Sequence, residues 1–194
     1  RAGGLFVFDH PNWKPVPDYA TDDLLDSMEG LRGMEIYCGV IERLPGEAKA
    51  TDRWDRLLSR GWQIWGHATD DQHAAADRFI GWNCVQWPAE QSVDAPGIIE
   101  ALSNGRFYAS TGVTIQHTGT IDNGHVCVVV SDADEVRWVG NGGGIIKKTE
   151  GGSAQLSVTE VLQAELPQGS RYARAECLGH GAAVAWTQPF RVRS

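Results

Sequence analysis

The chain of 194 residues lacks several features that would place it in a specialised class of protein. It contains no run of 18 apolar residues, which argues against a membrane-spanning helix. It has 17 Lys and Arg against 25 Asp and Glu, and this net charge of −8 argues against a nucleic-acid backbone as the main partner. An acidic balance is compatible with a carboxylate-rich metal site, because a bound cation offsets the local charge.

Cysteine is also scarce, and its spacing excludes the usual zinc patterns. The four cysteines are Cys38, Cys84, Cys127 and Cys177, and no two of them form a C-x-x-C pair. Each lies inside an apolar run, so we expect buried free thiols. A disulfide is the alternative, and it depends on the compartment in which the protein resides.

The first half of the chain alternates strand signals with helix signals, which is typical of a parallel α/β layer or barrel. The expected strands are 5–8, 34–38, 62–65, 79–87 and 106–109. The expected helices are 21–30, 50–60 and 94–105. Thr21 and Asp94 are typical N-cap residues, and the expected helices are stopped by Gly30, Gly61 and Gly105.

After about residue 112 the helix signals fade, and short strands recur between Gly, Asn and Asp turns. The candidate strands are 114–117, 125–130, 136–139, 144–148, 154–158, 171–178 and 183–193. This many short strands predict a small antiparallel β-sandwich. We therefore predict two domains, an α/β domain over residues 1–112 and a β-sandwich domain over residues 113–194.

Two short motifs in the first half carry metal-ligating side chains. His10 directly follows the expected 5–8 strand, and functional side chains gather at the carboxyl ends of parallel strands. Asp71 and His73 stand two residues apart, so in an extended segment both side chains address the same cluster. Carboxylate and imidazole together suit zinc, iron or manganese better than calcium. The competing interpretation is a solvated turn in which Asp caps a helix.

Three further residues are candidates for a supporting role near this site. Asp70 could orient His73 or a bound water. Glu35 is a charged residue inside a strand-like apolar run, so it either points to solvent or is placed at a site. His67 is either a ligand or a structural histidine.

Taken in order, the segments FVFDHPNW, GMEIYCG, WDRLLSRGWQIWGHATDDQH and IIEALSNGRFYASTG resemble the later part of the polymerase and histidinol phosphatase (PHP) superfamily. They are most similar to its metal-dependent phosphoesterase branch. The resemblance covers residues 5–112, and the rest is similar to the small C-terminal β domain of that branch. It implies an α/β plus all-β fold, with part of a (β/α)7 barrel followed by a small antiparallel β-sandwich.

The resemblance also assigns roles to residues. The later His-Pro of the family matches His10, and its final Asp-x-His matches Asp71 and His73, so these three are the implied metal ligands. Glu35 matches a common acidic position that is not a primary ligand, and His67 receives no role. The implied cofactors are divalent Mn, Zn or Fe ions, and the implied substrate is a small phosphorylated molecule. The ions of such an enzyme polarise the phosphoryl oxygens and lower the pKa of a bound water.

The chain departs from the family in its ligand set. The family's early His-x-His, further histidines and bridging Glu have no counterpart, because no histidine precedes His10. A transition metal ordinarily needs three or four protein ligands. We therefore expect a truncated fragment that by itself holds a metal ion poorly and hydrolyses phosphate esters at no useful rate. We also expect an open edge at the 5–8 strand, which a homo-oligomer or partner would cover. The alternative is a non-catalytic binding or scaffold module, whose β-sandwich recognises a carbohydrate or protein partner.

Overall fold

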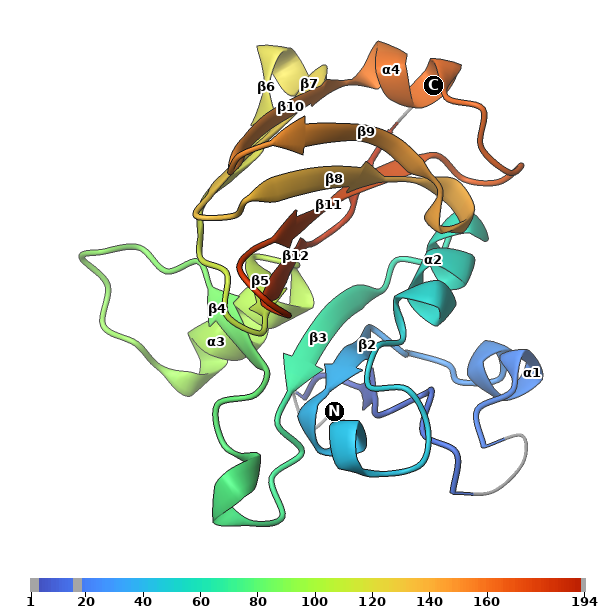
Figure 1. The fold of residues 1–194 in the computed structure, drawn as a ribbon, viewed down its shortest axis with the longest axis vertical. Helices are drawn as coiled ribbons and strands as arrows, with labels where there is room; N and C mark the ends of the chain where they lie inside the picture. Colours follow the sequence, from blue (N-terminus) through green and yellow to red (C-terminus); the bar gives the residue numbers. More distant parts are fainter. Residues whose placement is uncertain (1–3, 16–18, 193–194) are drawn as a thin grey trace.

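The computed structural model describes residues 4–15 and 19–192, which form mainly β-strands in three sheets (Figure 1). The strands are β1 (Val7–Phe8), β2 (Gly33–Cys38), β3 (Trp65–Thr69), β4 (Trp82–Val85), β5 (Phe107–Ser110), β6 (Ile115–Ile121), β7 (Val126–Ser131), β8 (Glu135–Val139), β9 (Ile145–Glu150), β10 (Ser153–Ser157), β11 (Tyr172–Leu178), β12 (Val184–Thr187) and β13 (Phe190–Arg191). The α-helices are α1 (Asp22–Asp26), α2 (Thr51–Ser59), α3 (Ala95–Ser103) and α4 (Val158–Gln163). The predicted combination of a partial (β/α)7 barrel and a β-sandwich is wrong, because the described chain is mainly β with four short helices.

One sheet is parallel, and it holds strands β1, β2 and β3 in that order. The apolar side chains of β2, including Met34 and Ile36, lie in one buried cluster with Trp54, Leu57 and Leu58 of α2. Each of these five side chains is at most 2% exposed. The apolar residues of α2, which recur at helical spacing, and those of β2 therefore form one core, and this core holds α2 against one face of the sheet.

The barrel prediction fails at β4 and β5, which are antiparallel neighbours. The segment between them contains α3, so this helix connects two antiparallel strands and is not a crossover between parallel strands. Strand–helix–strand alternation in a sequence is the same in both cases, which explains the error. β5 then pairs with β12, so both strands belong to a seven-stranded sheet in the order β4-β5-β12-β11-β8-β9, with β13 beside β11.

The local signals in the sequence were more reliable than the topology. Helices α1 and α3 begin as predicted, because Thr21 accepts from the backbone N–H of Leu24 and Asp94 from that of Gly97. The expected 62–65 strand is displaced, since β3 begins at Trp65 and runs to Thr69. Helix α4 was not predicted, although Ser157 and Glu160 form a capping box at its start.

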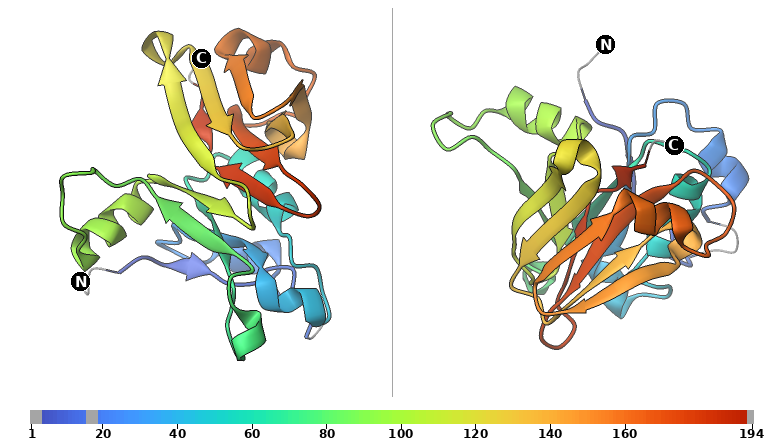
Figure 2. Two further views of the ribbon diagram at one scale, coloured as in Figure 1. Left: turned by 60° about the vertical axis from the view of Figure 1, so that its left-hand side comes forward. Right: turned by 90° about the horizontal axis from the view of Figure 1, so that it is seen from above.

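The third sheet has the antiparallel order β10-β7-β6, and Figure 2 shows it beside the strands of the seven-stranded sheet. Residues of both sheets share a second buried cluster that includes Val129, Trp138 and Leu156. Cys127 and Cys177 belong to this cluster, and all four cysteines are free thiols, as predicted, although Cys84 is half-buried. The domain boundary near residue 112 stays a prediction, and strands from both sides of it share the seven-stranded sheet.

Two side-chain amides join the parallel sheet to the larger one. Gln188 exchanges hydrogen bonds with Gly66, donating to its carbonyl at 2.8 Å and accepting from its N–H at 2.9 Å. Asn83 does the same for Ala68, at 2.9 and 3.1 Å. The edge of β3 is thereby satisfied without a further strand. Within the described residues, no helix is long and apolar enough to cross a membrane.

Candidate functional site

The carboxyl ends of β1, β2 and β3 meet at one edge of the parallel sheet. His10 lies two residues after β1, Cys38 is the last residue of β2, and Asp71 lies two residues after β3. The structure therefore brings the His-Pro motif and the Asp-x-His motif, far apart in sequence, to the same end of neighbouring strands. Both His10 and Asp71 adopt left-handed backbone conformations, with φ of 34° and 49°. Such conformations in residues other than glycine are uncommon, and they cluster at functional sites.

Glu35 connects the three strands. Its carboxylate accepts hydrogen bonds from the backbone N–H of His10 and from the hydroxyl of Thr69. The residue is only 2% exposed, and burial raises its pKa although both hydrogen bonds favour the charged form. Of the two predicted alternatives, pointing to solvent is therefore wrong. Glu35 holds the segment after β1 against the end of β3 and so positions His10.

The imidazole of His10 is oriented by two aromatic side chains. Nδ1 of His10 lies 3.2 Å from the hydroxyl of Tyr19, and the rings of His10 and Trp13 form a T-shaped pair with the centroids 4.9 Å apart. These contacts fix the plane of the ring and leave Nε2 as the nitrogen available to a ligand. Burial is the largest cause that raises the pKa of Tyr19, so its hydroxyl remains protonated at neutral pH.

Asp71 and His73 are joined locally but differ in exposure. The thiol of Cys38 lies 3.7 Å from Oδ2 of Asp71, so this carboxylate faces the end of β2. Nδ1 of His73 lies 2.7 Å from the backbone oxygen of Asp71, and the His73 side chain is 66% exposed. Asp71 thus points toward the strand ends, while His73 lies at the rim of the site.

The carboxylate of Asp70 bonds to the loop that follows β3, while its role in orienting His73 or a bound water stays a prediction. The carboxylate accepts hydrogen bonds of 2.7–2.9 Å from the backbone N–H groups of Phe79, Ile80 and Gly81. Burial raises the pKa of Asp70, but these three hydrogen bonds lower it, and the net shift is downward. Among the described residues, this carboxylate closes the loop between β3 and β4, and it makes no hydrogen bond to His73. The loop carries Phe79, whose side chain is 86% exposed and whose φ is 62°.

His67 is buried on the face of the sheet opposite α2. It pairs in register with Glu35, and its ring lies against Phe107 with the centroids 4.6 Å apart. Its Nε2 has no hydrogen-bond partner among the described residues, and burial lowers its pKa to about 4. His67 is therefore neutral at physiological pH. It is buried against Phe107 in the middle of β3, while Asp71 lies beyond the end of that strand.

The donor types at this sheet edge suit a divalent transition metal, but their number does not. Within residues 4–15 and 19–192, no group of three or more His, Cys, Asp or Glu side chains is placed to hold a metal ion. Such a site ordinarily needs three or four converging ligands. The described residues alone do not fit a complete metal centre, and no catalytic step through a metal is assigned to them.

Sequence reasoning missed the supporting contacts of Thr69, Tyr19 and Cys38. Thr69 is the last residue of β3, so a correct boundary for that strand would have identified it, whereas the predicted 34–38 strand already ended at Cys38. Comparison of the chain with protein-family models, with curated proteins and with solved structures finds no match.

Proposed function

We propose that this chain contributes one part of the site of a metal-dependent phosphoesterase, in which His10, Asp71 and His73 are metal ligands. The proposal is supported by one observation above the others. Two motifs separated by about 60 residues lie at the same end of neighbouring strands, and His10 and Asp71 both have a left-handed backbone. The buried carboxylate of Glu35 bonds to the backbone of His10 and to Thr69, two residues before Asp71. The resemblance of the sequence to the PHP superfamily supplies the reaction class.

The chain's own residues perform positioning tasks in this proposal. Glu35 holds the backbone of His10, Tyr19 fixes its ring, and Cys38 lies against the carboxylate of Asp71. A divalent ion bound there would polarise the phosphoryl oxygens and lower the pKa of a bound water. The remaining ligands must come from outside the described residues, because the described residues contain too few.

Metal binding is the direct test. Metal-stripped protein is titrated with Mn²⁺ or Zn²⁺ by calorimetry, and hydrolysis of p-nitrophenyl phosphate is followed in parallel. We expect weak metal binding that Asp71→Asn and His10→Ala abolish, with no turnover above background. The matched controls are Asp134→Asn and His180→Ala, which change exposed side chains of the same types outside the site.

Two results decide between the proposals. Metal affinity that is equal in Asp71→Asn, Asp134→Asn and the unchanged protein would exclude a metal site at the strand ends. Metal-dependent turnover that His73→Ala abolishes would show instead that the chain is sufficient by itself. An independent test is the coding sequence upstream of Arg1, where a His-x-His is expected if the missing ligands belong to the same polypeptide.

The other candidate, a non-catalytic binding or scaffold module, predicts neither metal binding at these residues nor turnover.

The open edge of the parallel sheet bears on both candidates. Among the described strands β1 pairs with β2 alone, and Phe6 beside it is 44% exposed. We propose that another polypeptide segment or a second copy of the chain covers this edge, because unpaired strand edges favour association.

A further inference from the structure

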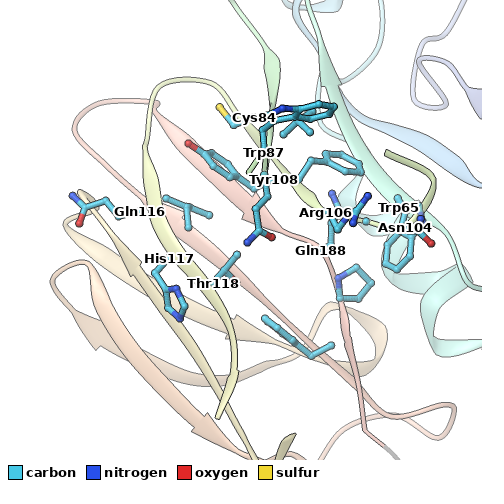
Figure 3. Close-up of a pocket in the computed structure, with 17 residues that line it drawn as sticks. Trp65, Cys84, Trp87, Asn104, Arg106, Tyr108, Gln116, His117, Thr118 and Gln188 are labelled. Atoms are coloured by element: carbon cyan, nitrogen blue, oxygen red, sulfur yellow. The ribbon is translucent and has the colours of Figure 1, made fainter. Parts of the chain in front are cut away.

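A second concave site lies at the opposite end of β3 from the predicted metal ligands. It is a cavity of about 520 Å³ between β4, β5, the start of β6 and the segment that joins β12 to β13. Trp65, the first residue of β3, lines it, whereas His10 and Asp71 lie beyond the other end of the parallel strands. Figure 3 shows Trp65, Asn104 and Arg106 on one side of this cavity and His117 and Thr118 on the other. The volume lies in the range of sites for small molecules.

Aromatic rings line this cavity, and its two indoles are held in place. The indole N–H of Trp65 donates to the backbone oxygen of Ser103 at 2.9 Å, and that of Trp87 to the backbone oxygen of Gln91 at 2.8 Å. Because both N–H groups are already paired, the indoles offer a ligand their ring surfaces and not a donor. Phe107 and Tyr108 also line the cavity.

The polar groups of the cavity are predominantly neutral. Gln86, Gln116 and His117 line it, are exposed, and make no side-chain hydrogen bond within the described residues. Neither Asp nor Glu is among the described lining residues, although the chain carries 25 of them. The lining cation, Arg106, is paired at 3.0 Å with Glu100, so it presents no unbalanced positive charge to an anion.

We propose that this cavity binds a neutral pyranose sugar. The ring faces of Trp65 and Trp87 carry negative π-density, which attracts the polarised C–H groups on the flat face of a sugar ring. The amides of Gln86 and Gln116 can each donate to one hydroxyl and accept from another. Among the described lining residues, an anion finds no unpaired Lys or Arg, and an ammonium group finds no carboxylate. This inference does not rest on the phosphoesterase proposal, because the two sites share no residue.

The test is binding of cellobiose, maltose and N,N′-diacetylchitobiose to the full chain, measured by calorimetry and by saturation-transfer NMR. We expect saturable binding of at least one of them, with transfer to the ring C–H protons. Gln86→Ala is expected to weaken that binding about fivefold, since one net hydrogen bond is lost. Trp87→Leu is expected to weaken it about tenfold, because a stacking surface is lost.

The matched control is Gln155→Ala, which truncates an exposed glutamine on β10 outside the cavity and should leave the affinity unchanged. Circular dichroism checks that each variant is folded. If Trp87→Leu fails to fold, Gln86→Ala still tests the proposal. The proposal is overturned if none of the three sugars binds, or if Gln86→Ala and Gln155→Ala bind them equally. It is also overturned if inorganic phosphate or adenosine binds this cavity and the sugars do not.

Discussion

Replacing Asp55 by alanine is expected to destabilise the protein strongly, because it leaves a buried guanidinium without its main partner. Asp55 on α2 receives two hydrogen bonds from Arg174 on β11, both 2.7 Å long, and one from the hydroxyl of Tyr172 at 2.8 Å. The Arg174 side chain is 1% exposed and that of Asp55 is 4% exposed. This interaction joins the core of the parallel sheet to the seven-stranded sheet.

The magnitude follows from burial. Removal of one partner of a buried ion pair costs about 3–5 kcal/mol, because the remaining charge stays desolvated. Glu176 still accepts from Arg174 at 2.8 Å, and the Arg174 guanidinium lies 5.1 Å from the Trp54 ring, so we expect the lower end, about 3 kcal/mol. For a chain of this size that loss corresponds to a decrease in Tm of roughly 6–12 °C.

Chemical denaturation and calorimetry of Asp55→Ala measure this loss directly. The control is Asp22→Ala, which breaks a pair of equal length, 2.7 Å to Arg56, whose side chains are 41% and 46% exposed. Exposed pairs contribute about 0–1 kcal/mol, so the control should change little. If Asp55→Ala and Asp22→Ala lose the same free energy of unfolding, burial does not govern these pairs and the reasoning is refuted.

Three other predictions concern pH and polar contacts. The folded pKa of His67, about 4, lies below the unfolded value of about 6.5, so the free energy of unfolding should fall as pH drops from 6.5 to 4. At pH 5 the loss is roughly 2 kcal/mol, and urea titrations of the protein and of His67→Leu would show whether this pH dependence disappears with the imidazole. Gln188→Ala leaves both backbone groups of Gly66 unpaired and should cost about 1–3 kcal/mol, with faster amide exchange at Gly66 as the diagnostic signal. Ser157→Ala removes the cap of α4 and should cost about 1 kcal/mol by thermal denaturation, and an unchanged Tm would contradict the capping role.

The candidate site was predicted in part because its side chains belong to short motifs next to strands. His10 and Asp71 follow β1 and β3 as expected, and the parallel pairing of β1, β2 and β3 places them at one edge. The loop-closing contacts of Asp70 could not be predicted, because the three N–H groups that donate to it belong to a loop about ten residues further along the chain. A carboxylate that closes a loop and one that orients a ligand have the same sequence signature.

The helix positions of this protein follow from short-range features of its sequence. Thr21, Asp94 and the apolar spacing in α2 specify where helices lie, because caps and periodicity act within a few residues. The antiparallel pairing of β4 with β5 and the pairing of β5 with β12 are visible only in the folded chain, and they make the described residues mainly β. Strand pairing depends on hydrogen bonds and packing between residues far apart in the chain, and alternation of strands and helices does not encode it.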